Sequence, residues 1–454
     1  MKTTTTDRRR VQKAAREVWK RLDSDARARA LAGEPRRKAL AYRLPPVRRR
    51  RAPFIPRDAY LSQVQAAVAR CLAEKRGAPR LAGATDPDPV TDQIFERFSP
   101  DDWRWITTVV AEGLRALVGT HAFGTTPADE RMADRVRLVV FADWATGSTR
   151  AQRLADRIRE RLDEPGLERH LIHLGDVYYA GLPDEYRDRF LRFWPATPDD
   201  ARLRSWNLNG NHDMYSGGHA YFDLLAGRLA AADGEAAGNA FAHQQGTSCF
   251  RLYNDHWQVI ALDTAYVDND LVDAQLPWLE QWMGLDQPSD ASDTADGTPR
   301  KTILLSHHQL GSARAQDSVG PGIRDKTERV RDTGRVHAWI WGHEHRAFVY
   351  EPYLGVQCPV CIGNGGVPEL LTRMFTLEGL FQSIAAAISR LKALFRRRVP
   401  APVIAYEPRA PEIDPDGLKW EQLGFVVIDL DGPDGRAVYV GEENPSDVTI
   451  EGFG

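Results

Sequence analysis

Residues 171–181 read LIHLGDVYYAG, an apolar run that ends in a glycine, an aspartate and two tyrosines. A short continuous apolar run of this kind is typical of a strand that is covered on both faces of its sheet. Asp176 follows the run directly, and Tyr179 stands three residues further along. A capping carboxylate followed by core aromatic residues is one interpretation, and two metal ligands at the end of a strand is the other.

Four further apolar runs between residues 136 and 345 also end in residues of metal-ligand type. Helical patterns, such as 148–162 and 183–194, alternate with these runs, which indicates a sheet covered on both faces. The runs at 247–254 and 256–266 lie so close together that we expect part of the sheet to be antiparallel. Side chains at the carboxyl ends of strands converge in such folds. The five endings contain Asp143; Asp176 and Tyr179; Asn211, His212 and Asp213; His307 and His308; and His343 and His345.

The chemistry of these endings indicates a metal centre. Burying several carboxylates and imidazoles without partners is costly, and a bound cation removes that cost. Oxygen and imidazole donors without thiolates suit Fe, Mn, Zn or similar ions rather than a closed structural zinc site. The candidates are too numerous for one ion, and they suit two ions about 3.5–4 Å apart, the spacing of two-metal phosphoester hydrolysis sites.

In chain order the motifs form the series D, GDxxY, GNHD, H and GHxH, and this series resembles the calcineurin-like metallophosphoesterase superfamily. GNHD at 210–213 and GHEH at 342–345 form its most specific pair. The resemblance covers about 131–366 and the closing strands near 424–443. The glycine-rich segment CIGNGGVPE, which follows GHEH, resembles the purple acid phosphatase branch. The resemblance implies an α/β fold, a four-layer α/β/β/α sandwich with mixed sheets, here with an additional N-terminal helical region.

The first motif also resembles the purple acid phosphatase branch. Most of the superfamily has D-x-H at this place, whereas this chain has Ala145 instead of the His. Purple acid phosphatases lack the same His and use a Tyr three residues after the second Asp, the position of Tyr179, so Tyr178 is interpreted as a core or neighbouring residue. The resemblance implies two metal ions, Fe(III) together with Fe, Zn or Mn. It implies Asp143, Asp176, Tyr179 and His345 as ligands of the first ion, and Asp176, Asn211, His307 and His343 as ligands of the second.

The same resemblance implies a reaction. A hydroxide activated by the metals would attack phosphorus, and His212 would donate a proton to the leaving alcohol, a step typically worth ~10²–10⁴-fold. Asp213 either orients a neighbouring catalytic group or caps its turn, and both interpretations stay open. Of the adjacent His307 and His308, His307 is the predicted ligand because the family's His begins the turn, although Gln309 replaces the family's Pro.

We therefore expect a metallophosphoesterase that hydrolyses a phosphoester substrate. A phosphodiesterase acting on a nucleotide or lipid headgroup, and a catalytically silent scaffold with the same fold, are the alternatives. The intact series of ligand-type residues argues against the scaffold, since a scaffold needs no such constellation.

The charge and hydropathy patterns suggest five regions. Residues 1–60 carry 19 Lys and Arg against 6 Asp and Glu, although the net charge of the 454-residue chain is −3. Such an asymmetry is typical of a basic arm attached to an acidic body. We predict a basic, flexible arm at 1–57, a helical lobe at 58–130, the catalytic core at 131–370, an inserted amphipathic helix and loop at 371–412, and C-terminal strands at 413–454 that complete the core.

The segment 376–399 has apolar residues at steps of three or four and basic residues at its far end, which predicts an amphipathic helix. Packing over the rim of the site is one interpretation. Binding to an anionic membrane surface, together with the basic N-terminus, is the other. No aromatic residues interleave with the basic runs, so we do not expect nucleic-acid binding.

The four cysteines are too few for a disulfide framework, and CPVC at 358–361 is interpreted as two buried thiols. No apolar run of signal-peptide type follows the basic N-terminus, and none approaches the ~18 residues of a membrane span. We therefore expect a cytoplasmic protein. Peripheral contact with a membrane through the amphipathic segment is the alternative.

Overall fold

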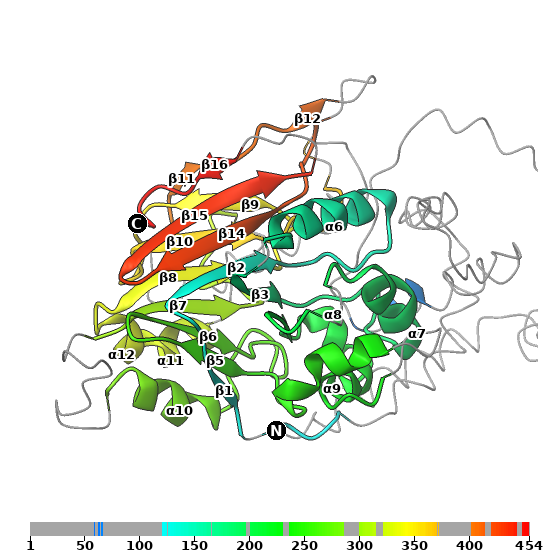
Figure 1. The fold of residues 1–454 in the computed structure, drawn as a ribbon, viewed down its shortest axis with the longest axis horizontal. Coiled ribbons are helices and arrows are strands. Elements are labelled where there is room, and N and C mark those ends of the chain that lie inside the picture. The colour runs from blue at the N-terminus through cyan, green and yellow to red at the C-terminus, as the bar shows by residue number, and fades with distance from the viewer. Residues whose placement is uncertain are drawn as a thin grey trace, which may run out of the picture.

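Two β-sheets packed face to face form the centre of the molecule (Figure 1). In this computed structural model, the described residues are 59, 62–63, 65–66, 120–124, 126–164, 166–196, 200–229, 236–285, 299–314, 321–369, 371, 401–413, 419–442 and 447–453. The six-stranded sheet has the order β16 (Val448–Thr449), β15 (Asp434–Gly441), β14 (Gly424–Asp431), β2 (Arg135–Phe141), β3 (Glu168–His173), β4 (Leu203–Asn207). Its β2, β3 and β4 are parallel, whereas β14 and β15 are antiparallel to their neighbours.

The second sheet has eight strands and is also mixed. Its order is β1 (Ala128–Arg131), β5 (Phe250–Tyr253), β6 (Trp257–Leu262), β7 (Lys301–Ser306), β8 (Val336–Trp341), β10 (Cys358–Ile362), β9 (Ala347–Tyr350), β11 (Ile404–Tyr406). The four central strands β6, β7, β8 and β10 are parallel. A separate hairpin pairs β12 (Glu412–Ile413) with β13 (Lys419–Trp420).

Helices cover the outer face of each sheet. On the six-stranded sheet lie α6 (Thr149–Leu162), α7 (Pro183–Glu185), the π-helical turn Tyr186–Phe190, the 3₁₀ turns Leu191–Phe193 and Ala236–Gln244, and α9 (His219–Leu225). On the eight-stranded sheet lie α10 (Gln275–Trp282), α11 (Pro321–Lys326) and α12 (Glu328–Arg331). One apolar cluster fills the space between the sheets and one lies under each helical layer, which makes four layers.

Helix α6 shows how the local sequence produces this packing. Ser148 precedes it, and its hydroxyl accepts a hydrogen bond from the Ala151 N–H at 3.2 Å, which satisfies one of the free donors of the first turn. Leu154, Ile158 and Leu162 recur every four residues and are buried against the sheet. The helix therefore fixes the segment between β2 and β3, so that both strands end at the same edge of the sheet (Figure 1).

The predicted α/β fold with mixed sheets is confirmed. Two boundaries differ from the sequence prediction, because residues 128–130 of the predicted helical lobe belong to β1, and residues 404–406 of the predicted insertion belong to β11. Both segments pair with core strands, β5 and β9. The predicted arm at 1–57 and the amphipathic helix at 376–399 lie outside the described residues. Within the described part of the chain, no helix combines the length and the apolar character that crossing a membrane requires.

Candidate metal centre

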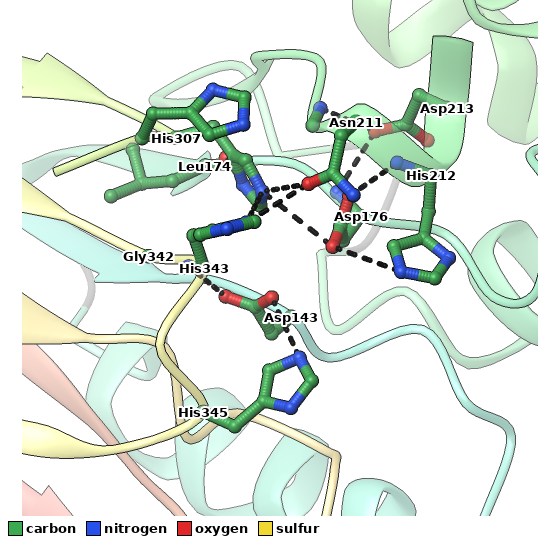
Figure 2. Close-up of polar contacts among 12 residues, drawn as sticks. Asp143, Leu174, Asp176, Asn211, His212, Asp213, His307, Gly342, His343 and His345 are labelled. Atoms are coloured by element: carbon green, nitrogen blue, oxygen red, sulfur yellow. Dashed lines mark hydrogen bonds and ion pairs between the residues drawn. The ribbon is translucent and has the colours of Figure 1, made fainter. Parts of the chain in front are cut away.

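Polar residues from all five predicted strand ends lie close together; Figure 2 shows Asp143, Asp176, Asn211, His212, Asp213, His307, His343 and His345. The strands β2, β3 and β4 are parallel neighbours in one sheet, and β7 and β8 are parallel neighbours in the other, so their carboxyl ends face a common space. Asp143 follows β2, and Asp176 follows β3. After β4, the helical turn α8 (Asn211–Met214) carries Asn211, His212 and Asp213; His307 follows β7, and His343 and His345 follow β8.

A first set of donor atoms surrounds the phenol oxygen of Tyr178. This oxygen lies 2.9 Å from Asp143 Oδ1, 3.2 Å from Asp176 Oδ2 and 3.0 Å from His345 Nε2. His345 Nε2 lies 3.5 Å from Asp143 Oδ1. Donors held by one ion at ~2.0–2.2 Å are themselves about 3–3.6 Å apart, so this set has the spacing of a metal coordination shell.

A second set lies beside the first and shares one atom with it. Asn211 Oδ1 lies 3.1 Å from His307 Nε2 and 2.9 Å from His343 Nδ1, and the two nitrogens are 3.2 Å apart. His307 Nε2 also lies 3.5 Å from Asp176 Oδ2, the oxygen that faces Tyr178. Asp176 therefore places a single oxygen within reach of both sets, which is the geometry of a bridging ligand.

The tautomer of His307 fits a metal ligand. Its Nδ1 lies 2.9 Å from the carbonyl oxygen of Leu174. Because a carbonyl can only accept, Nδ1 carries the hydrogen, and Nε2 directs its lone pair toward Asn211 and Asp176. These contacts fit the ligand role predicted for His307.

His308 lies just outside the second set. Its ring centroid is 4.6 Å from that of His343, and one donor atom each of His307, His308 and His343 lies within 4.8 Å of the others. Its Nδ1 lies 3.2 Å from Thr264 Oγ1, and its Nε2 lies 3.4 Å from Asp268 Oδ1. The sequence had placed His308 at this strand end, but only the structure shows its distance from His343.

Tyr178, not the predicted Tyr179, brings its phenol against the two carboxylates. The Tyr179 ring packs instead against Arg189, whose guanidinium carbon is 4.9 Å from the ring centroid. The carboxylate of Glu185 accepts the backbone N–H groups of Tyr179 and Ala180 and so holds the turn in this orientation. Spacing along the sequence predicted Tyr179 as the ligand, but it does not say which of two adjacent tyrosines faces the carboxylates, and in the structure that residue is Tyr178.

His212 faces the donor sets with one nitrogen. Its Nδ1 lies 2.6 Å from the Tyr179 carbonyl oxygen, to which it donates, and its Nε2 lies 4.0 Å from Asp176 Oδ2. The ring packs on Tyr178 with 4.7 Å between centroids. Burial is the main cause that lowers the pKa of His212 below its usual value, so the neutral imidazole is favoured in the metal-free protein.

Asp213 holds backbone groups instead of facing the donor sets. Its two oxygens accept hydrogen bonds from the N–H groups of Asp176, Val177 and Gly210 and from the Tyr186 hydroxyl. Of the two interpretations left open by the sequence, these contacts favour orienting a neighbour, because three of the four donors lie outside α8.

The electrostatics of the two buried carboxylates fit a cation. Burial raises the pKa of Asp143 to about 7. Burial alone would raise that of Asp176 too, but the imidazoles of His307 and His212 outweigh it and the net shift is downward. Among the described residues, the contacts of these carboxylates come from imidazole, phenol and backbone N–H groups, and none comes from Lys or Arg. Two buried acids without a fixed cation are costly, and metal ions would remove that cost.

Four donor residues have left-handed backbone conformations, with φ of 55° at Asp143, 74° at Asp176, 69° at His343 and 53° at His345. Such conformations are uncommon outside glycine and are retained where the surroundings enforce them. Here the Asp143 carboxylate accepts the His343 N–H at 2.8 Å, and Asp213 accepts that of Asp176 at 2.8 Å. Residues of the site thus hold one another's backbone in place.

The interpretation of CPVC as two buried thiols agrees with the structure. Cys358 packs between the sheets and Cys361 packs under the outer helices, so both thiols are buried and they lie in separate clusters.

Comparison with known proteins identifies the domain. Residues 136–347 match the family model described as calcineurin-like phosphoesterase, and this range contains every strand end of the site. Residues 136–347 thus form a calcineurin-like phosphoesterase domain, which supports a phosphoesterase activity. This confirms the family resemblance drawn from the motifs. Among curated proteins, no sequence shows significant similarity to the chain.

Solved structures provide distant matches. A purple acid phosphatase, PPD1, from yellow lupin (Lupinus luteus) is 14% identical with a TM-score of 0.46, and the match covers 70% of this chain and 53% of that one. GAP50, titled the anchor in the inner membrane complex of Plasmodium, is 12% identical with a TM-score of 0.45, covering 70% and 89%. A cold-active protein-tyrosine phosphatase from Shewanella is 10% identical with a TM-score of 0.30, covering 72% and 83%. The chain spans about half the length of the lupin protein, and none of these likenesses supports an inference about activity.

Proposed function

We propose that this protein is a phosphoester hydrolase with a dinuclear metal centre. The observation that carries the proposal is the pair of donor sets that share Asp176 Oδ2, which lies 3.2 Å from the Tyr178 phenol oxygen and 3.5 Å from His307 Nε2. Two ions held side by side by a common carboxylate would supply an activated water and neutralise charge on the phosphoryl oxygens.

The two sets would hold different ions. The residues that would hold the first ion are Asp143, Asp176, Tyr178 and His345, and those that would hold the second are Asp176, Asn211, His307 and His343. A phenolate added to two carboxylates is a hard anionic donor set, which suits Fe(III). The amide and the two imidazoles of the second set suit a divalent ion such as Fe, Zn or Mn.

His212 supplies the proton in this proposal. Its Nδ1–H is committed to the Tyr179 carbonyl, so only Nε2 can exchange a proton with a substrate held at the donor sets. A water activated by the ions would form the new P–O bond while the P–O bond to the leaving group breaks. In its imidazolium form His212 carries a second proton on Nε2, and the leaving oxygen would take that proton and depart as an alcohol. General acid catalysis of this kind is typically worth ~10²–10⁴-fold in rate.

A combined measurement of metal content, visible absorption and hydrolysis tests the proposal. Protein purified without added chelator should contain two metal ions per chain and hydrolyse p-nitrophenyl phosphate or bis(p-nitrophenyl) phosphate. Relative rates on these two compounds would show whether the substrate class is a monoester or a diester. Removal of the metals should abolish hydrolysis, and addition of them should restore it. A protein that takes up no metal and cleaves neither compound would overturn the proposal.

A further inference from the structure

Two segments of the site exchange backbone hydrogen bonds through their aspartates. The Asp176 N–H donates to Asp213 Oδ2 at 2.8 Å, and the His212 N–H donates to Asp176 Oδ1 at 2.9 Å. Each carboxylate thus holds the backbone of the segment that bears the other (Figure 2). The loop after β3 and the turn α8 are thereby fixed relative to each other.

Asp213 does more than cap α8. A capping role requires only the bond from the Gly210 N–H, at 2.6 Å. Three further donors come from outside α8, namely the N–H groups of Asp176 and Val177 and the Tyr186 hydroxyl, which lies 2.6 Å from Oδ1. Four donors match the about four acceptor sites that a carboxylate offers. These hydrogen bonds oppose the burial that raises the pKa of this side chain to about 7.

The contacts of Asp176 show what this arrangement achieves. Its backbone has φ of 74°, a conformation that the bond to Asp213 holds in place. Its Oδ1 is occupied by the His212 N–H, so Oδ2 is the oxygen left to face both donor sets. A rotation of this residue would break the bridge between the two metal positions.

We infer that Asp213 and Tyr186 form a positioning pair that orients the bridging carboxylate of Asp176 and thereby sets the affinity of the centre for its metal ions. This inference rests on the proposed function. Tyr186 lies on the helical layer over the outer face of the six-stranded sheet and touches neither donor set, so it acts only through Asp213.

The backbone around Asp213 and Asp176 is packed so closely that the loops have little room to move. A Cβ atom on Gly181, which has φ of 63°, would lie 2.6 Å from Asp213 Cα, and one on Gly210 would lie 2.1 Å from Asp176 Oδ1. The two segments therefore touch through glycines. A change in the orientation of Asp213 should be transmitted to Asp176 rather than absorbed by the loops.

Metal titration of metal-free protein by calorimetry, with Mn²⁺ or Zn²⁺ alone as the probe, tests the inference. The variants are Tyr186→Phe, Asp213→Asn and the double variant. Mutation of a residue that orients a metal ligand typically lowers metal affinity by ~10–100-fold. We expect that range for Asp213→Asn. An amide has only one acceptor oxygen, and its NH₂ would face N–H or O–H donors to which it cannot bond. Tyr186→Phe removes one of four donors and should cost about tenfold.

The matched control is Tyr221→Phe. Tyr221 is as buried as Tyr186, but its hydroxyl donates to the Asn207 carbonyl at 3.0 Å. It should lower the melting temperature of the metal-free protein about as much as Tyr186→Phe while leaving metal affinity unchanged. The double variant should bind metal as Asp213→Asn does, because both changes act through one carboxylate.

An unchanged metal affinity in Tyr186→Phe would overturn the inference. A loss of metal affinity in Tyr186→Phe no greater than that in Tyr221→Phe would overturn it as well. Tyr186→Phe decides the question even if Asp213→Asn does not fold. Failure of the proposed function looks different, because the wild-type protein would then take up no pair of ions. If the wild-type protein binds two ions and Tyr186→Phe binds them equally well, only the positioning role fails.

Discussion

The two donor sets share one aspartate yet differ in charge. The first combines Asp143, Asp176 and a phenol with one imidazole, whereas the second adds only a neutral amide and two imidazoles to the shared carboxylate. The two sets have similar donor spacings, and their residues are buried except for the partly exposed His345. The difference lies in how much negative charge each presents, and it suggests that the protein distinguishes two ions by charge rather than by the size of the site.

The largest expected effect comes from removing the shared ligand. Asp176→Ala deletes the oxygen that contacts both sets, so both ions should be lost and hydrolysis should fall to background. Elemental analysis of the purified variant measures the metal content. Asn211→Ala is the matched comparison, since it removes a donor of the second set alone and should retain the first ion. Retention of both ions by Asp176→Ala would show that the two sets do not depend on a bridge.

The next effect separates catalysis from metal binding. His212→Ala should keep both ions, because His212 lies outside both sets, and should lose ~10²–10⁴-fold in kcat as the proton donor disappears. Rates on p-nitrophenyl phosphate, measured together with metal content, test this expectation. The loss should shrink for a substrate whose leaving group is a strong acid, since such a group departs without a proton. Full activity in the variant would remove His212 from the mechanism.

Removing the hydroxyl of Tyr178 or of Tyr179 tests which tyrosine belongs to the first donor set. Tyr178→Phe should abolish a tyrosinate-to-iron charge-transfer band and weaken binding of the first ion about 10–100-fold, whereas Tyr179→Phe should keep the band. Visible spectra of the two variants, which lose the same hydroxyl one residue apart, measure the difference directly. If the band disappears in Tyr179→Phe and persists in Tyr178→Phe, the donor set drawn from the structure is wrong and the sequence spacing is right.

The same pair of tyrosines shows where prediction from sequence succeeds and where it ends. The apolar runs before Asp143, Asp176 and His343 predicted both the strands and the convergence of their ends, because parallel strands bring their carboxyl ends to one edge. Which of Tyr178 and Tyr179 faces the carboxylates depends on two tertiary features. One is the left-handed backbone of Asp176, and the other is Glu185, whose carboxylate accepts the N–H groups of Tyr179 and Ala180. These are tertiary contacts that no spacing rule contains.

Asp213 illustrates a second limit of prediction from sequence. Its place in GNHD identified it as a residue of the site, and both catalysis and capping suited that place. Only the three-dimensional contacts show that its partners include the backbone of Asp176 and the hydroxyl of Tyr186, which is 27 residues away in sequence. The motif therefore predicted the location of the residue but not its role.

The smallest expected effect is a pH dependence that differs between the sets. Burial raises the pKa of Asp143 to about 7 and lowers that of His307. A raised carboxyl pKa means that Asp143 binds a proton near neutrality, and this proton must leave before a metal ion can bind. A lowered imidazole pKa means that His307 is already neutral and ready to bind. Affinity of the first set for Mn²⁺ should thus fall as the pH decreases, by about fivefold between pH 7 and pH 6, while affinity of the second set stays nearly constant.

Calorimetric titration of the metal-free protein at pH 6, 7 and 8 measures both affinities and the protons released on binding. The first binding event should release a proton at pH 6 and little at pH 8, if Asp143 is the group that titrates. A parallel weakening of both sites would mean that the proton resides on the shared Asp176 instead. In that case the two sets would differ in the number of their anionic donors but would respond to acid as one unit, because the bridge couples them.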